Sequence, residues 1–92
     1  MALVKKQLIV KNKSGLHARP AALFVQVANK FESRITVKRD DEEVNGKSIM
    51  GIMMLEAGSG SKVTVITKGE DAEAAMAELE ALLLSDIEET IK

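Results

Sequence analysis

The residues best suited to chemistry in this 92-residue chain lie in the stretch 14–22, SGLHARPAA, which holds its only histidine. Pro20 fits the first turn of a helix, because its missing N–H and its fixed φ cost little there. A helix that begins between His17 and Pro20 leaves its first backbone N–H groups free to bind an anion. Arg19 adds a permanent positive charge two residues after the imidazole. This combination predicts a site for a phosphoryl group, with His17 at or next to the N-cap.

A lone histidine has a simpler interpretation, because most such residues are solvated at the surface or hydrogen-bonded in the core. The neighbours of His17 favour a functional role instead. A helix N-terminus disfavours the imidazolium ion, so we expect a neutral imidazole at pH 7, as a nucleophilic carrier of a group requires. Gly15 lets the incoming backbone make a turn that is closed to other residues.

Composition sets limits on the class of protein. We expect one globular domain over residues 1–92, because 46% of the residues are hydrophobic and 29% are charged. The absence of cysteine excludes disulfides and thiolate metal sites. No carboxylate pair or metal-ligand cluster lies near His17, so we expect neither a metal nor a cofactor. No apolar run approaches the ~20 residues that span a bilayer, and we expect a cytoplasmic protein without a membrane partner.

The net charge of −1 conceals an asymmetry along the chain. Residues 1–48 contain ten Lys or Arg against five Asp or Glu, whereas residues 70–92 contain eight acids and one base. A basic half could indicate nucleic acid, but two Phe and no Tyr or Trp provide no platform for stacking bases. The histidine half is therefore expected to face an anionic group or an acidic protein, and not nucleic acid.

The pattern of hydrophobic residues predicts the order β-α-β-β-α-β-α. Strands are expected at residues 5–11, 34–39, 42–45 and 61–67, and helices from residue 20 to about 31 and over residues 48–55. Asp71 is expected to cap a last helix. Helices on one face of a small antiparallel sheet make an α+β open-faced sandwich. The predicted buried stripes consist of Phe24, Val27, Ala28 and Phe31 in the first helix and of Ala72, Ala75, Met76, Leu79, Leu82 and Leu83 in the last.

Ser48 precedes the helix that is richest in methionine. Serine is a favoured N-cap, which contributes about 1 kcal/mol through its side-chain oxygen without any further function. The apolar residues of this helix are too many to face one sheet, so some of them, with Ile49, Met50 and Met53 as candidates, are expected to form an exposed docking surface. Gly51 indicates that another part of the molecule or a partner approaches closely. Phosphate on Ser48 would add about two negative charges to this surface.

Two separate motifs carry a resemblance to a known family. GLHARPAA at residues 15–22, followed by VNGKSIMGIMML at residues 44–55, resembles the histidine-containing phosphocarrier (HPr) family of the bacterial phosphoenolpyruvate-dependent phosphotransferase system. The similarity covers essentially the whole chain. The resemblance implies a four-stranded antiparallel sheet of order 1-4-2-3 with three helices on one face. It also implies a carrier that is not an enzyme by itself, because a shallow site with one Arg needs its partners to complete each transfer.

The resemblance also implies roles for individual residues. His17 corresponds to the histidine that accepts a phosphoryl group on Nδ1 from phosphorylated enzyme I and passes it to an enzyme IIA. Arg19 corresponds to the arginine that steadies this group. Ser48 corresponds to the serine that HPr kinase/phosphorylase modifies, with a transcription regulator as a further partner. The surrounding loop and helix start would consist of Ser14, Gly15, Ala18 and Pro20.

Three alternatives stay open at this point. Met54, Glu56 and residues 58–60 resemble the regulatory or nitrogen-related branch more than the sugar-transport branch, although the Ser48 motif resembles the kinase-regulated type. A β-α-β-β-α-β core also suits an RNA-recognition module, but the aromatic sheet signature is missing. A regulatory homologue that acts only through phosphorylated Ser48 would not need His17. Because a carrier docks with several partners in turn, we expect a monomer.

Overall fold

Four strands form one antiparallel sheet in the order β1-β4-β2-β3. The structure is a computed structural model, and it describes residues 2–11, 13 and 15–84. The two longest strands pair along their whole length, from Ala2 opposite Gly69 to Ile9 opposite Lys62. The strands are β1 (Ala2–Ile9), β2 (Arg34–Arg39), β3 (Glu42–Asn45) and β4 (Lys62–Gly69). The residue pattern predicted the antiparallel α+β class and the family resemblance implied this sheet order, and the structure confirms both.

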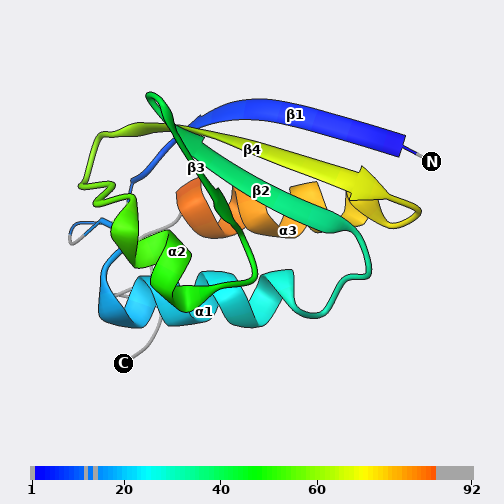
Figure 1. The fold of residues 1–92 in the computed structure, drawn as a ribbon, viewed down its shortest axis with the longest axis horizontal. Coiled ribbons are helices and arrows are strands. Elements are labelled where there is room, and N and C mark those ends of the chain that lie inside the picture. The colour runs from blue at the N-terminus through cyan, green and yellow to red at the C-terminus, as the bar shows by residue number, and fades with distance from the viewer. Residues whose placement is uncertain (1, 12, 14, 85–92) are drawn as a thin grey trace.

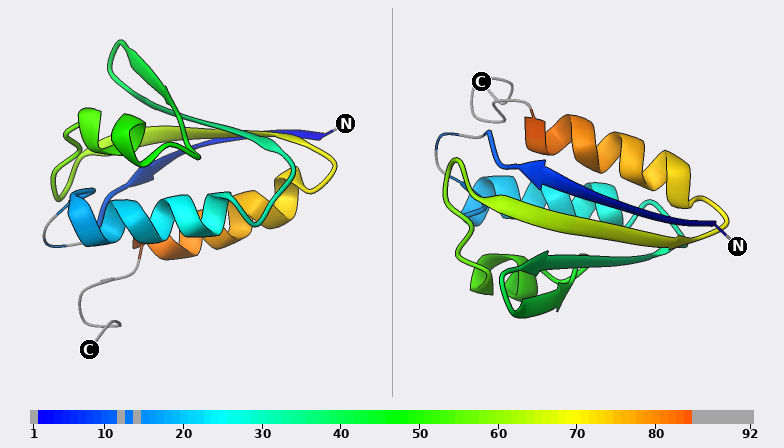
Figure 2. Two further views of the ribbon diagram at one scale, coloured as in Figure 1. Left: turned by 60° about the horizontal axis from the view of Figure 1, so that its bottom comes forward. Right: turned by 90° about the horizontal axis from the view of Figure 1, so that it is seen from above.

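Three helices complete the order β-α-β-β-α-β-α, as predicted. They are α1 (Ala18–Ala28), α2 (Ile49–Met54) and α3 (Ala72–Leu84). Helices α1 and α3 lie side by side under one face of the sheet, and the short helix α2 packs beside α1 at the β3 edge (Figures 1 and 2). No helix in the part of the chain that the structure describes has the length and apolar character needed to cross a membrane.

The core lies between the sheet and the helix layer. Its side chains include Phe24 from α1, Ile52 from α2 and Leu79 from α3, all of which are fully buried. Val37 and Val65 fill it from the sheet, at positions that pair directly across β2 and β4. Because one core receives side chains from every helix, the short α2 is held by its buried residues more than by its own six-residue length.

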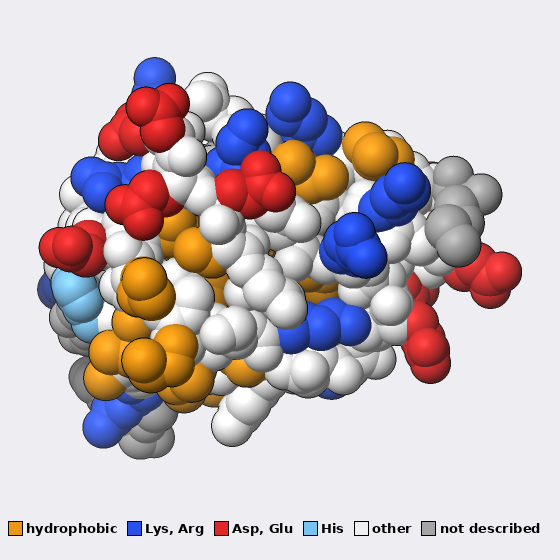
Figure 3. All heavy atoms as spheres, in the orientation of Figure 1, with side chains coloured by type: hydrophobic (Ala, Val, Ile, Leu, Met, Phe, Trp, Pro, Cys, Tyr) orange, Lys and Arg blue, Asp and Glu red, His pale blue; other side chains and the backbone are white. Residues whose placement is uncertain are grey.

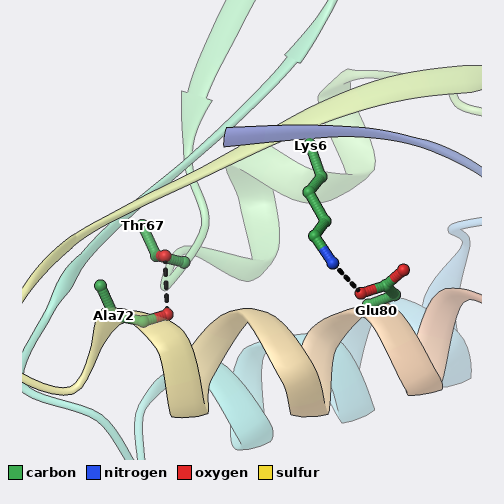
Figure 4. Close-up of polar contacts among 4 residues, drawn as sticks. All are labelled: Lys6, Thr67, Ala72 and Glu80. Carbon is green, nitrogen blue, oxygen red and sulfur yellow. Dashed lines mark hydrogen bonds and ion pairs between the residues drawn. The ribbon is translucent and has the colours of Figure 1, made fainter. Parts of the chain in front are cut away.

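Helix α3 is attached to the sheet by polar contacts at its first residue and in its C-terminal half. The hydroxyl of Thr67 donates to the carbonyl of Ala72 at 2.8 Å, and Lys6 forms an ion pair of 2.8 Å with Glu80 (Figure 4). Thr67 is buried, so its hydrogen bond satisfies a polar group inside the protein. Lys6 and Glu80 are partly exposed, and such a pair contributes only about 0.2–1 kcal/mol.

Asp71 occupies the expected position just before α3, where its carbonyl accepts the first helical hydrogen bond from the N–H of Ala75. Its carboxylate does a different task from the one predicted, because it accepts hydrogen bonds from the loop after α1. The N–H groups of Glu32 and Ser33 donate to it at 2.8 and 2.9 Å, and the Ser33 hydroxyl donates as well. The Ser33 hydroxyl, with help from these N–H groups, lowers the pKa of Asp71 below its ordinary value of 3.8.

The limits of three elements differ from the predicted ones. Strand β1 covers residues 2–9 and not 5–11, and β4 covers residues 62–69 and not 61–67. Both strands begin and end where their pairing does, from Ala2 opposite Gly69 to Ile9 opposite Lys62. Helix α1 ends at Ala28 and not near Phe31, because Asn29 forms the C-cap and its side-chain amide also donates to the carbonyl of Val25. The remaining predicted elements agree with the structure to within a residue or two.

Candidate functional site

The loop that leads into α1 is fixed by a segment from the other half of the chain. Gly15 has φ +70°, and a Cβ atom at this position would lie 2.5 Å from the carbonyl oxygen of Ala57 and 2.6 Å from the Cα of Gly58. The next residue, Leu16, is buried and donates its N–H to the same Ala57 carbonyl at 2.8 Å. Only glycine fits both the conformation and the space, so the backbone just before His17 has one firm position.

His17 is the N-cap residue of α1, as the sequence predicted. Its backbone is extended, with φ −101° and ψ −173°, and its carbonyl accepts a hydrogen bond of 2.7 Å from the N–H of Ala21. The imidazole makes no capping hydrogen bond with the helix, and the residue is exposed. Pro20 is buried within the first turn. The backbone of His17 therefore builds the helix start, while its exposed imidazole takes no part in capping.

Two further groups of the first turn can bind an anion. The N–H groups of Ala18 and Arg19 precede the first intrahelical hydrogen bond, so they point out of the helix end without a helical partner. Ala18 and Arg19 are both exposed. Among the residues that the structure describes, the ion pairs are Lys6–Glu80 and Lys30–Glu78, so no ion pair there engages the Arg19 guanidinium. The fourth loop residue of the prediction, Ser14, lies outside the described residues.

Ser48 is the N-cap of α2, and its side chain caps the helix by accepting a hydrogen bond from the first turn. The hydroxyl oxygen accepts a hydrogen bond of 3.1 Å from the N–H of Gly51, and the Ser48 carbonyl accepts one of 3.0 Å from Ile52. The other end of α2 is also held, because the Arg39 guanidinium donates to the carbonyl of Leu55 at 3.0 Å. Both ends of this short helix therefore have partners that fix its orientation.

Helix α2 presents an apolar patch to solvent, made of Ile49, Met50, Met53 and Met54. Figure 3 shows hydrophobic side chains over α2, next to the pale blue side chain of the single histidine. The three residues predicted to be exposed, Ile49, Met50 and Met53, are indeed exposed. Gly51 faces inwards, where a Cβ atom would lie 3.2 Å from the Cβ of Val44 and 3.3 Å from the carbonyl oxygen of Asn45. The close neighbour that Gly51 indicated is thus β3.

Helix α2 is also tied to α1. The Lys47 ammonium donates to the carbonyl of Phe31 at 2.6 Å, and the Asn29 side chain donates to the Lys47 carbonyl at 3.4 Å. Sequence reasoning missed these contacts, the contact of Gly15 with Ala57 and the Arg39 bond, because each joins residues far apart in the chain. In the described residues, no group of three or more His, Asp or Glu side chains could hold a metal ion. The candidate site is therefore an exposed imidazole, an arginine, two open N–H groups and an apolar patch.

A family model described as the PTS HPr component phosphorylation site matches residues 4–85, which is most of the chain. The chain belongs to the HPr family of phosphotransferase-system phosphocarriers. Proteins of this family are phosphocarriers, as the names of the relatives state.

Similar proteins from three bacteria agree with this family. The HPr-like protein Crh of Halalkalibacterium halodurans is 56% identical over 81 residues, which cover 88% of this chain and 96% of Crh. A crystal structure of the phosphocarrier protein HPr from Bacillus anthracis is 52% identical, with a TM-score of 0.87 over 90% of this chain and 99% of that one. A crystal structure of an HPr dimer from Thermoanaerobacter tengcongensis is 51% identical, with a TM-score of 0.71 over 90% and 91%.

Proposed function

We propose that His17 carries a phosphoryl group from phosphorylated enzyme I to an enzyme IIA. The observation that supports this most is the state of the imidazole, which is exposed at the N-cap of α1 and is not used for capping. In the transfer, the lone pair of Nδ1 attacks the phosphorus atom, and the donor nitrogen takes back the electron pair of the P–N bond that breaks. The phosphoryl group then passes in the same way from Nδ1 of His17 to a histidine of enzyme IIA, and the His17 imidazole is free again. No other reactant is consumed.

The groups around His17 suit a carrier that must release its cargo. The N–H groups of Ala18 and Arg19 and the Arg19 guanidinium can bind the phosphoryl oxygens. We propose that they hold the group against hydrolysis and that the partner protein supplies the remaining stabilisation of the transition state. Gly15, Pro20 and, by the sequence motif, Ser14 are proposed to position the loop, and a metal or cofactor has no part in the step.

The exposed patch on α2 is proposed to dock these partners. Enzyme I and enzyme IIA would contact Ile49, Met50 and Met53 while His17 receives or donates the group. We propose that the chain is one carrier domain that acts as a cytoplasmic monomer, because a dimer that covered this patch would compete with docking. Analytical ultracentrifugation at micromolar concentration would give the mass of one chain, and a dimer that persists on dilution would contradict this part.

Ser48 is proposed as the regulatory residue, modified by HPr kinase/phosphorylase. Its hydroxyl lies at the N-terminus of α2, where about two negative charges are tolerated, and next to Ile49 and Met50 of the patch. Phosphate there would therefore change docking without unfolding the helix. A solution structure of Crh, described as the Bacillus subtilis catabolite repression HPr and 46% identical to this chain, supports a regulatory branch. The choice of enzyme IIA is therefore to be tested with acceptors of the transport and the regulatory kind.

The first experiment is incubation of the chain with enzyme I and phosphoenolpyruvate, followed by intact mass and acid lability. We expect one acid-labile phosphoryl group that is lost in His17→Ala. Ser48→Ala is the matched control, since it also changes an N-cap residue but leaves the imidazole, and it should still be labelled. A wild-type chain that stays unlabelled with a competent enzyme I would contradict the carrier function and would favour a purely regulatory homologue.

The rival RNA-binding function has a specific observation against it. An RNA-recognition sheet stacks bases on aromatic side chains, but Phe24 and Phe31 lie in α1 and just after it and not on the sheet. The chain contains no other aromatic residues of the Phe, Tyr or Trp type. Binding of single-stranded RNA at physiological salt would be needed to revive this alternative.

A further inference from the structure

The methionines of the described residues divide into an exposed set and a buried one. Met50, Met53 and Met54 on α2 are 69%, 39% and 61% exposed, whereas Met76 on α3 is only 2% exposed in the core. The chain contains no cysteine, so methionine is the only sulfur it has. The reactive sulfur of the described residues is therefore concentrated on one six-residue helix beside His17.

Exposed methionine reacts with peroxides in a simple two-electron step. The thioether sulfur attacks one peroxide oxygen, the O–O bond breaks, and water leaves with the second oxygen, so that sulfur is oxidised and peroxide is reduced. The product is a sulfoxide, which changes a flexible apolar side chain into a polar one. A dithiol reductase of the methionine sulfoxide class returns the thioether, with a disulfide as its oxidised product.

We propose that Met50, Met53 and Met54 form an oxidation switch, in which peroxide converts the docking patch into a polar surface and lowers phosphoryl transfer through His17. This inference rests on the proposed function, because it concerns the surface that docks the donor and the acceptor. Peroxide is the oxidant, and a sulfoxide reductase resets the switch. The reactant that modifies the three methionines is thus a small peroxide, and the modification is expected to change the rate of phosphoryl transfer through His17.

The anchoring of α2 explains why the switch leaves the fold intact. Ile52 and Leu55 are buried at 0% and 1% exposure, and they attach the helix to the core through its inner face. The Ser48 hydroxyl and the Arg39 guanidinium hold the two ends by hydrogen bonds. None of these groups contains sulfur. Oxidation therefore changes the outer face of α2 while the inner face and both ends stay as they are.

Limited treatment of the full chain with hydrogen peroxide tests the first step. Peptide mass mapping should find one added oxygen on Met50 and Met54 first, on Met53 next and on Met76 last, with the N-terminal peptide resolved separately. Far-ultraviolet circular dichroism and the urea midpoint should stay within error of the untreated chain. Oxidation of Met76 before the α2 methionines, or loss of the folded signal at the first added oxygens, would overturn the proposal.

The second step compares the rate of labelling by phosphorylated enzyme I before and after peroxide, within each variant. The ratio of the labelling rate after peroxide to the rate before it should be about 0.1 for the wild type and for Met76→Leu. This is the change expected for a lost apolar contact in an interface. The ratio should stay near one for the triple variant Met50→Leu, Met53→Leu, Met54→Leu. Sulfoxide reductase should restore the wild-type rate.

The outcomes separate the two proposals. A chain that enzyme I does not label even before peroxide contradicts the carrier function itself. A chain that is labelled equally fast with and without the three sulfoxides keeps the carrier function and overturns the switch. Equal inactivation of the triple leucine variant would also overturn it, because the damage would then lie outside α2.

Discussion

The starts of α1 and α2 use the same helix position in opposite ways. At α1, the N-cap His17 contributes only its carbonyl to the helix, and the imidazole is left exposed. At α2, the N-cap Ser48 contributes both its carbonyl and its hydroxyl, which accepts from Gly51. The first arrangement leaves the His17 side chain free for chemistry, whereas in the second the Ser48 side chain stabilises the helix. An N-cap position thus shows where a helix begins but not what its side chain does.

The start of α3 adds a third use of the same position. Asp71 gives its carbonyl to α3 but its carboxylate to Glu32 and Ser33, so it joins two segments that are distant in the chain. The side-chain partners of Asp71 are thus decided by tertiary structure, whereas Ser48 has its partner three residues further along the chain. Substitutions at the three helix starts, and in the loop before α1, should separate these uses of the N-cap position.

Gly15→Ala should have the largest effect on stability. The new methyl group would meet the Ala57 carbonyl at 2.5 Å in a backbone with φ +70°, so we expect a loss of about 3 kcal/mol or more in the free energy of unfolding. Gly60→Ala is the matched control, because Gly60 has φ +87° with open space around it. It should cost about 1 kcal/mol. Equal costs in urea unfolding would show that the contact with Ala57 has no part in the effect.

Ser48→Ala and His17→Ala should separate the two N-caps in stability. The serine variant loses its bond from Gly51 and should be about 1 kcal/mol less stable. The histidine variant loses no capping bond and should stay within about 0.5 kcal/mol of the wild type. Urea unfolding of both variants measures the difference. A larger loss for the histidine variant would contradict the statement that the imidazole is not used for capping.

Asp71→Asn should have an effect that depends on pH. The folded pKa of Asp71 lies below the unfolded value of 3.8, so its ionised form stabilises the protein above pH 3.8, and this stability is lost as pH falls through the folded pKa. The wild type should therefore be more stable than the variant at neutral pH. The difference in their free energies of unfolding should narrow as the pH falls below 3.8. Urea midpoints over a pH series measure it.

Ser33→Ala sharpens the same prediction. The Ser33 hydroxyl is the largest cause of the lowered pKa of Asp71. Without it, the loss of stability on acidification should begin at a higher pH than in the wild type. NMR titration of the Asp71 carboxyl in both proteins gives the two values directly. An unchanged value in Ser33→Ala would assign the lowered pKa to the two N–H groups instead.

Local sequence was sufficient to predict most of the fold. Alternation in Ile35 and Val37, and the helical spacing of Ala75, Met76 and Leu79, agree with the strand and helix in which these residues are buried. The proline at position 20 gave the start of α1, and the structure confirms His17 as its N-cap. These features depend on residues within a few positions of one another, which is why a single sequence reveals them.

The features that could not be predicted all depend on distant partners. The added length of β1 and β4 comes from their pairing, in which Ala2 lies opposite Gly69. The tertiary fold brings the carboxylate of Asp71 to Ser33 and the Arg39 guanidinium to the Leu55 carbonyl, where they form hydrogen bonds. The roles of His17, Arg19 and Ser48 stay predictions from the sequence motifs, since the structure gives their positions and not their reactions.

The hydrogen bond from Leu16 to Ala57 makes the candidate site a product of completed folding. The loop before His17 takes its position only when the segment after α2 lies against it, so neither half of the chain can form the site alone. A nascent or partly unfolded chain would then offer enzyme I no ordered acceptor. On the proposed function, phosphoryl flow would pass only through finished molecules, and the fraction of chains labelled would count those that are folded.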